Sequence, residues 1–248
     1  MLQELHKLGV TIIYADFYHL YIETGKYDVE SANVYLQSIT NTIQSNDLFE
    51  FLTLTPYTYW QTFLFKDAFN YGGVKINIPN EEKTDDDDEE PETETSLIGH
   101  WNLVEYLPEP LQDYVLAIVS DFFRLPLQHR LAREENENGD EVQTQALAIE
   151  KSKKADEDFL RQLVSREFTR RTLELVNRIQ NDLATGRSQE LQEFPDLAGS
   201  HLQFKSPALE VVKTITHIMA LDKLVEHEVG VMRRNLQKLL HVREFAKE

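Results

Sequence analysis

The chain of 248 residues contains no cysteine. Disulfide bonds, thiolate zinc sites, iron–sulfur clusters and a cysteine nucleophile are therefore excluded within these boundaries, and any metal would need histidine or carboxylate ligands. No apolar run approaches the roughly 20 residues that span a membrane, and the first residues, MLQELHKLGV, lack the zones of a secretory signal. We expect a soluble intracellular chain with no membrane partner.

Motifs of several common catalytic sites are also missing. The sequence has neither of the glycine-rich phosphate cradles, G-x-x-x-x-G-K and G-x-G-x-x-G, and it has no H-E-x-x-H metal motif. A G-x-S-x-G elbow is absent, and the run Gly199, Ser200, His201 lacks the strand-turn-helix context of such a nucleophile. The eight histidines are scattered, so we favour surface roles for them over metal binding.

The net charge of −18 is unevenly distributed. Residues 80–96 hold ten acidic residues and one lysine, which contributes −9, half of the total. A calcium loop interleaves its ligands with turn-forming residues such as glycine, and this run has none. A solvated, self-repelling insertion is therefore favoured over a calcium site.

Apolar patterning divides the chain into three parts. Residues 1–79 mix strand and helix signals, residues 80–99 form an acidic insertion that we expect to be disordered, and residues 100–248 are helical, with a mobile stretch near 134–150. No internal repeat is present. The predicted fold class is therefore α+β, in which a β-hairpin or antiparallel sheet with a helix is followed by an all-α region.

The first part is expected to begin with a β-hairpin, because two β-rich runs meet at the polar residues 16–18. A helix over 28–45 should follow, with Asp28 as its N-cap. A polar turn at 67–70 separates two later strands. The strands predicted in this part are 10–15, 19–23, 52–55, 59–65 and 71–75.

Several signals mark the helices of the last part. Pro126 lies inside an apolar stripe and should kink or break that helix. The longest helix is expected over 155–184. The next helix should begin with Ser206 as N-cap and Pro207 at its first position, and a break at 221–222 should precede the last helix.

The hairpin tip carries most of the functional information. The letters I-Y-A-D-F-Y-H-L-Y-I resemble the catalytic hairpin of B-family DNA polymerases, whose pattern is Y-G-D-T-D-S. In that family, carboxylates at alternate positions of the hairpin help to hold two magnesium ions. Here Tyr14, Ala15 and Asp16 occupy the first three positions, but Tyr18 replaces the second aspartate. A neutral phenol is a poor magnesium ligand, so Asp16 and Tyr18 are expected to be vestigial, with no catalytic residue and no metal.

A second segment, WQTFLFKDAFNYGGVK, resembles the part of B-family polymerases in which a K-K-R-Y motif touches the primer backbone. Tyr71 and the two glycines match the end of that motif. Lys66 is kept, but residues 67–70 are Asp, Ala, Phe and Asn, which puts the phosphate contact in doubt. Lys66, Tyr71 and Lys75 are therefore candidate contacts to a DNA backbone.

A third set of candidate contacts lies in the helical part. Residues 151–187 hold nine basic and six acidic residues, and Arg166 and Arg170 are four positions apart, which places them on one helix face. These arginines could meet a DNA backbone or an acidic partner. The exposed side of an amphipathic helix is the plainer interpretation, and we favour it.

A narrower resemblance covers the chain from about residue 8 to residue 245. Its short matches follow the order found in the C-terminal, non-catalytic half of the large subunit of DNA polymerase epsilon. They are N-Y-G-G-V-K at 70–75, H-W-N-L at 100–103, Y-L-P at 106–108, F-P-D-L-A-G-S-H-L at 194–202 and S-P-A-L-E at 206–210.

This resemblance implies a degenerate palm remnant over 1–79 and a thumb-like region over 100–248. It also implies a nuclear location and partners among the other subunits of DNA polymerase epsilon, the replicative helicase and DNA. The family's magnesium, zinc and iron–sulfur cluster would lie outside these residues, so no cofactor is expected here. The parent protein would be a DNA-directed DNA polymerase, a nucleotidyltransferase.

Three functions are therefore weighed. The leading one is an inactive polymerase module that acts as a scaffold of the replisome. The second is an active B-family fragment that contributes DNA binding and one metal ligand, Asp16. The third is an unrelated α+β interaction module.

Overall fold

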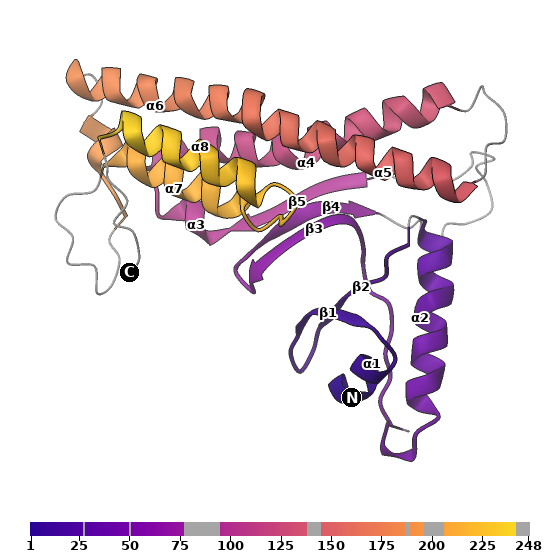
Figure 1. The fold of residues 1–248 in the computed structure, drawn as a ribbon. Helices are drawn as coiled ribbons and strands as arrows, with labels where there is room; N and C mark the ends of the chain where they lie inside the picture. The colour runs from indigo at the N-terminus through magenta and orange to yellow at the C-terminus, as the bar shows by residue number, and fades with distance from the viewer. Residues whose placement is uncertain are drawn as a thin grey trace, which may run out of the picture. The chain divides into compact units, whose positions relative to one another are not determined.

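The computed structural model describes most of the chain as an α+β protein with two small antiparallel sheets and several helices (Figure 1). The predicted fold class is confirmed. Two compact units are present: the N-terminal unit, Met1–Phe63 with Val74–Ser96, and the helical unit, Leu64–Gly73 with Leu97–Glu248. The residues described are 1–26, 28–49, 51–76, 95–137, 145–186, 189–195 and 206–241.

The N-terminal unit contains the predicted hairpin, whose strands β1 (Thr11–Ala15) and β2 (Leu20–Glu23) pair in antiparallel fashion. A short helix that the sequence did not suggest, α1 (Leu2–Lys7), precedes them. Helix α2 (Val29–Gln44) follows and is capped by Asp28, whose side chain accepts a hydrogen bond from the amide of Ser31 at 2.6 Å. A short 3₁₀ helix, η1, spans Asp47–Phe49.

The core of this unit is small and is formed by four buried residues. Leu5 of α1 and Val10 beside β1 meet Ile39 and Ile43 of α2, and all four are almost fully buried. The spacing of Ile39 and Ile43 places them on one face of α2. Helix and hairpin are therefore joined by apolar burial.

A second sheet has the strand order β3-β4-β5, with β3 at Tyr59–Asp67, β4 at Asn70–Ile76 and β5 at Thr95–Trp101. Strands β3 and β4 confirm the predicted pair and turn. Strand β5 was missed and begins inside the predicted insertion, 80–99, so residues 95–99 are not part of a disordered segment. Residues 80–94 lie outside the described residues. The predicted division into three domains otherwise stays a prediction.

The predicted strand at 52–55 is wrong. Residues 52–58 have no regular secondary structure. The local apolar alternation satisfies a strand pattern, but a strand also needs a neighbour for its backbone hydrogen bonds. No strand of the described chain pairs with these residues.

Helices dominate the second unit. The short α3 (Asn102–Glu105) leads into α4 (Glu109–Glu137), and one helical run continues through α5 (Gln145–Gln162), the π-helix η2 (Leu163–Phe168) and α6 (Thr169–Ala184). After the 3₁₀ helix η3 (Gln189–Gln192) come α7 (Pro207–Met219) and α8 (Glu226–Leu239).

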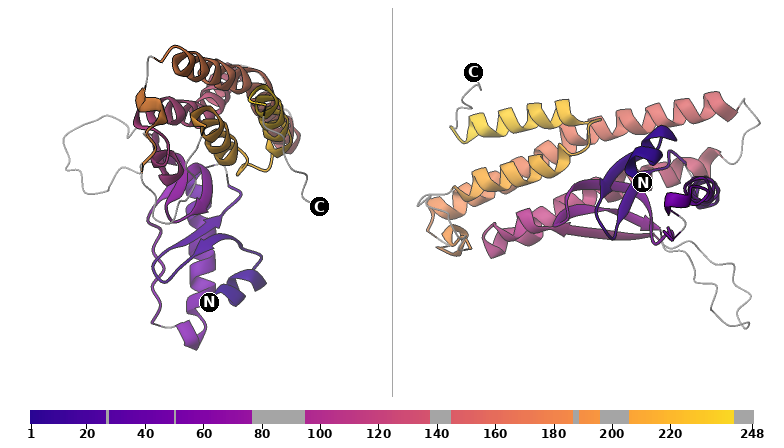
Figure 2. Two further views of the ribbon diagram at one scale, coloured as in Figure 1. Left: turned by 90° about the vertical axis from the view of Figure 1, so that its left-hand side faces the viewer. Right: turned by 90° about the horizontal axis from the view of Figure 1, so that it is seen from below.

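Helix α7 is central to this unit, since it contacts α4, α6 and α8 (Figures 1 and 2). A helix that is apolar on several faces is stable only when other helices cover it. The buried residues of α7 are Pro207, Ala208, Val211, Val212, Ile215, Thr216, Ile218 and Met219.

Two predictions about these helices need correction. Pro126 was expected to kink or break its helix, but α4 runs through it to Glu137, so the chain does not break there; burial of Phe122 and Phe123 in the preceding turn outweighs the lost hydrogen bond. The longest helical run begins at Gln145, earlier than expected. The mobility of 134–150 stays a prediction, since its two ends belong to α4 and α5 and 138–144 lie outside the described residues.

The other helix signals are confirmed. Ser206 is the N-cap residue of α7 and Pro207 its first helical residue, although the Ser206 side chain makes no capping hydrogen bond. The break at 221–222 separates α7 from α8. Within the described ranges, no helix is long and apolar enough to cross a membrane.

Candidate functional site

The tip of the β1–β2 hairpin is built around the carboxylate of Asp16. Its Oδ1 accepts hydrogen bonds from the backbone amides of Tyr18 at 2.7 Å and His19 at 2.5 Å, and its own amide donates to the carbonyl of His19 at 2.9 Å. An aspartate at this position mimics a backbone turn. The amide of Tyr18 first, and then that of His19, hold the pKa of Asp16 below its usual range, since both stabilise the charged form.

The second carboxylate oxygen also contacts residues of the hairpin. Oδ2 accepts a hydrogen bond from the Tyr14 hydroxyl at 3.3 Å and lies 3.3 Å from Nδ1 of His19. Loss of water contact raises the pKa of the Tyr14 phenol, and the nearby Asp16 charge raises it further. Both oxygens of Asp16 therefore stabilise the turn itself.

The position that corresponds to a second carboxylate is turned to solvent. Tyr18 is 91% exposed, and its neighbour Phe17 is fully exposed. No group of three or more His, Asp or Glu side chains suited to a metal ion occurs in the described part of the chain. One carboxylate that already binds two amides, beside a phenol, does not fit the two-magnesium site of an active polymerase hairpin.

The β3–β4 turn is held by a second aspartate. Asp67 Oδ2 accepts a hydrogen bond from Lys66 Nζ at 2.8 Å, and its Oδ1 accepts from the Asn70 side chain and the Phe69 amide, each at 2.9 Å. The Lys66 ammonium and then the Asn70 amide lower the pKa of Asp67 to about 2. Lys66, a candidate DNA contact, is thus an ion-pair partner of its own neighbour.

Asn70 joins this turn to the start of α3. Its side-chain oxygen accepts a hydrogen bond from the Leu103 amide at 2.9 Å, and the Phe69 carbonyl accepts one from the Asn102 amide at 3.2 Å. The Asn70 side chain is nearly buried, so its donor and its acceptor are both satisfied by protein. The polar residues that replace the basic motif here have a structural role.

The glycines after Tyr71 have a packing role. A Cβ at Gly72 would lie 2.9 Å from Cζ2 of Trp101, and a Cβ at Gly99 would lie 2.8 Å from its Nε1. The Trp101 indole also stacks on Phe123 of α4, with ring centroids 6.5 Å apart. The indole therefore requires two residues without side chains beside it.

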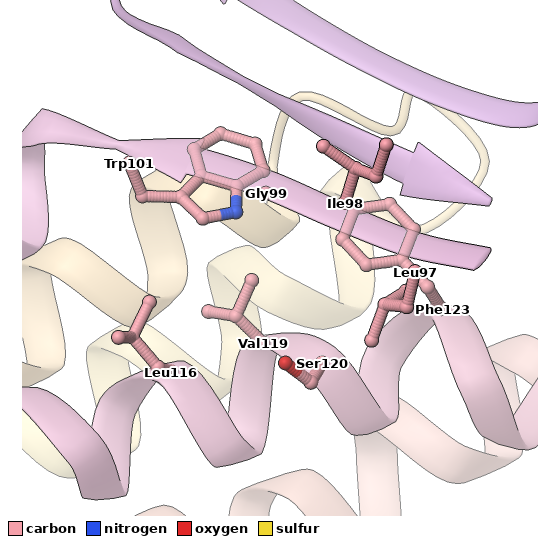
Figure 3. A pocket seen from close by; sticks show the side chains of 8 residues that line it. All are labelled: Leu97, Ile98, Gly99, Trp101, Leu116, Val119, Ser120 and Phe123. Atoms are coloured by element: carbon pink, nitrogen blue, oxygen red, sulfur yellow. The ribbon is translucent and has the colours of Figure 1, made fainter. Parts of the chain in front are cut away.

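A small apolar cavity of about 200 Å³ lies between β5 and α4 (Figure 3). It is smaller than ordinary small-molecule sites, which measure roughly 300–1,000 Å³. No ionisable side chain lines it. The lining residues are Leu97, Ile98, Gly99, Trp101, Leu116, Val119, Ser120 and Phe123.

Tyr71 and Lys75, two further candidate DNA contacts, lie on β4. The Tyr71 ring is half-buried between Phe65 and His100, with centroid distances of 6.5 and 5.0 Å. Lys75 is also half-buried, and it makes no ion pair with the side chains that the structure describes. The structure gives Tyr71 a packing role and leaves the Lys75 contact a prediction.

Of the two arginines, Arg170 is paired. Its guanidinium binds Glu167 at 2.8 Å and Glu174 at 2.6 Å. Arg171 extends this network to Asp121 of α4, at 2.6 Å. Arg166, in the π-helix η2, is exposed, and no ion pair of this residue occurs among the described side chains. A π-helix turn often marks a functional position, and Arg166 is the exposed charged residue of this turn. Glu167, by contrast, is half-buried and paired with Arg170 and Arg171.

The sequence did not suggest that His217 lies near the charges of Lys66 and Arg233. Partial burial lowers the pKa of His217 on α7, and the charges of Lys66 and Arg233 lower it further. The three residues come from β3, α7 and α8, so only tertiary structure brings them near each other. No spacing in the sequence could have revealed this group.

Comparison with known proteins identifies relatives along the whole chain. Residues 1–74 match the family described as "Domain of unknown function (DUF1744)". The whole chain aligns with a DNA polymerase epsilon catalytic subunit of Arabidopsis thaliana at 29% identity and with that of Saccharomyces cerevisiae at 30%. It aligns with a second DNA polymerase epsilon catalytic subunit of Arabidopsis thaliana at 28% identity.

The chain spans 10 or 11% of the length of these relatives. Their similarity runs through both units and through the hairpin, the β3–β4 turn and the helices described above. The chain is therefore similar, over its whole length, to a C-terminal segment of DNA polymerase epsilon catalytic subunits.

Proposed function

We propose that this chain is a non-catalytic scaffold segment of a DNA polymerase epsilon large subunit, which supports DNA replication in the nucleus. Its partners would be the other subunits of the polymerase and the replicative helicase. The hairpin tip carries the proposal: Asp16 uses both carboxylate oxygens in its own turn, and Tyr18 takes the place of a second carboxylate. DNA-directed DNA polymerase activity would belong to other parts of the parent protein.

Exposed apolar side chains in the N-terminal unit support a binding role. Five of them are more than four-fifths exposed, and four of these five are aromatic. Exposed aromatic residues are frequent anchors of protein interfaces. The five residues are Phe17, Tyr18, Leu48, Phe51 and Tyr57.

DNA is the less well supported partner. Phosphate binding rests on several available cations, but Lys66 and Arg170 each bind a neighbouring carboxylate. Of the basic candidate contacts to DNA, this leaves Arg166 and Lys75, in a chain with a net charge of −18. An active fragment with Asp16 as a metal ligand is disfavoured by the same turn hydrogen bonds, and the homology disfavours an unrelated adaptor.

The experiment uses the tagged full-length parent protein and measures co-purification of the helicase and of the polymerase's second subunit. A Phe17→Ser/Tyr18→Ser variant should lower recovery of one partner by about tenfold or more, which corresponds to about 1.4 kcal/mol. Primer extension by the same preparation should be unchanged. Leu239→Ser, at a half-exposed position of α8, is the matched control.

Two outcomes would contradict the proposal. One is unchanged recovery of both partners by the Phe17→Ser/Tyr18→Ser variant and by a deletion of residues 1–248. The other is a loss of primer extension with both partners retained, which would favour a catalytic or DNA-binding fragment.

A further inference from the structure

Only two of the eight prolines follow a hydroxyl residue, at Thr55-Pro56 and at Ser206-Pro207. A protein kinase that selects proline after its acceptor residue must bind an extended chain. It must also reach both the acceptor hydroxyl and the pyrrolidine ring. The sequence alone cannot distinguish these two positions, but their structural surroundings differ.

The Ser206-Pro207 pair is unsuited to such a kinase. Pro207 is buried and is the first residue of α7, and the Ser206 carbonyl accepts the hydrogen bond of the Glu210 amide at 3.0 Å. Binding this pair in extended form would unwind the start of α7. The buried residues Val211 and Val212 would then lose their packing.

The Thr55-Pro56 pair has the opposite surroundings. Residues 52–58 have no regular secondary structure, Thr55 and Pro56 are exposed, and Tyr57 is 94% exposed. No hydrogen bond of the Thr55 hydroxyl occurs among the described residues. A residue that precedes proline is also restricted to extended conformations, which reduces the entropy lost on binding.

We propose that Thr55 is a phosphorylation site for a proline-directed protein kinase. In this step Oγ1 of Thr55 attacks the γ-phosphorus of MgATP, and the bond from that phosphorus to the oxygen it shares with the β-phosphate breaks. ADP leaves, and the hydroxyl proton passes to the catalytic aspartate of the kinase. The inference does not depend on the proposed scaffold function.

The added phosphate would stay on the surface. Residues 1–63 hold seven Asp and Glu residues but only two lysines, Lys7 and Lys26, and no arginine. Lys7 is already paired with Glu4. Phosphorylation adds about −1.5 to −2 charge, so it should make this surface more acidic.

The test incubates the purified chain with MgATP and a cyclin-dependent kinase, and maps the product by tandem mass spectrometry. We expect one phosphoryl group on Thr55 and none on Ser206. Thr55→Ser should keep the modification, whereas Thr55→Val and Pro56→Ala should each lower incorporation at least tenfold. Ser206→Ala should leave phosphoryl incorporation unchanged.

Two synthetic peptides distinguish the effect of the local sequence on phosphorylation from the effect of the folded structure. Peptides 50–60 and 201–212 should both be substrates, while only Thr55 should react in the folded chain. The proposal is overturned if Thr55 in the folded chain reacts more than about a hundredfold slower than its peptide, if Pro56→Ala reacts like the wild type, or if Ser206 is modified as fast as Thr55.

Discussion

Cζ2 of Trp101 lies 2.9 Å from the point that a Cβ would occupy at Gly72, closer than two such carbon atoms approach without a shift. The carbonyl oxygen of Ile98 is 3.0 Å from the same point, so backbone as well as side chain would have to move. Gly72→Ala should therefore lower the free energy of unfolding by about 1–3 kcal/mol.

The matched control is Gly230→Ala. A Cβ at Gly230, inside α8, meets no atom within 4 Å, and alanine is favoured over glycine in a helix by roughly 1 kcal/mol. Chemical denaturation should show a lower free energy of unfolding for Gly72→Ala and a higher one for Gly230→Ala than for the wild type. Equal effects of the two substitutions would contradict the packing of Trp101 described above.

The side chain of Asn70 should be important for stability, because it links the β3–β4 turn to α3. Asn70→Ala leaves the Leu103 amide without its acceptor and removes one donor to Asp67. We expect the free energy of unfolding to fall by about 1–3 kcal/mol. Asn177→Ala, at an exposed position of α6, should change it by no more than about 0.5 kcal/mol. Similar losses in both variants would rule out the bridging role.

Asp67 should titrate far below an ordinary aspartate. Its pKa is about 2 in the folded chain against an ordinary value of 3.8. Because the folded value is the lower one, the stability that Asp67 contributes is complete above about pH 3.8 and is lost as the pH falls toward 2. Carbon-13 NMR of the Asp67 carboxyl group, followed as a function of pH, measures the midpoint of its titration directly.

Lys66→Met is the variant that tests the cause of this shift. The Lys66 ammonium is the largest contribution, so its removal should raise the Asp67 pKa toward the ordinary value. A wild-type midpoint near 3.8, or an unchanged midpoint in the variant, would show that the ion pair does not form in solution.

Restoring the missing carboxylate should not create a polymerase. In a Tyr18→Asp variant, Asp16 would still accept the amide hydrogen bonds that hold the turn. We expect no template-dependent primer extension by the purified variant, with circular dichroism as a check on folding. Extension that is lost again in Asp16→Ala/Tyr18→Asp would refute the vestigial interpretation of this hairpin.

The elements that could be predicted from the sequence depend on local signals. The hairpin over 10–23 follows from two β-rich runs, and Asp28 marks its helix start because a cap acts on an amide three residues away. Pro207 marks the start of α7 in the same way. Tyr18 at the position where the polymerase resemblance expects a carboxylate was also visible, since residue identity is read directly from the sequence.

Other features depend on partners that are distant in the chain. Strand β5 forms because β4 supplies its backbone hydrogen bonds, whereas residues 52–58 have no neighbouring strand in the described chain. The presence of such a neighbour cannot be read from the local pattern. Pro126 stays inside α4 because buried neighbours compensate for its missing amide. Arg171 pairs with Asp121 of α4, fifty positions away, which no spacing within its own helix could indicate.

By itself, the sequence determined the α+β class, the presence of Asp16 and Tyr18 at the hairpin tip, and the resemblance to polymerase epsilon, because these rest on residue identity and short-range order. Tertiary structure alone decided that both oxygens of Asp16 stabilise its turn and that Gly72 leaves room for Trp101. It also decided that Thr55, unlike Ser206, precedes an accessible proline. Burial and partner choice depend on which surfaces meet after folding.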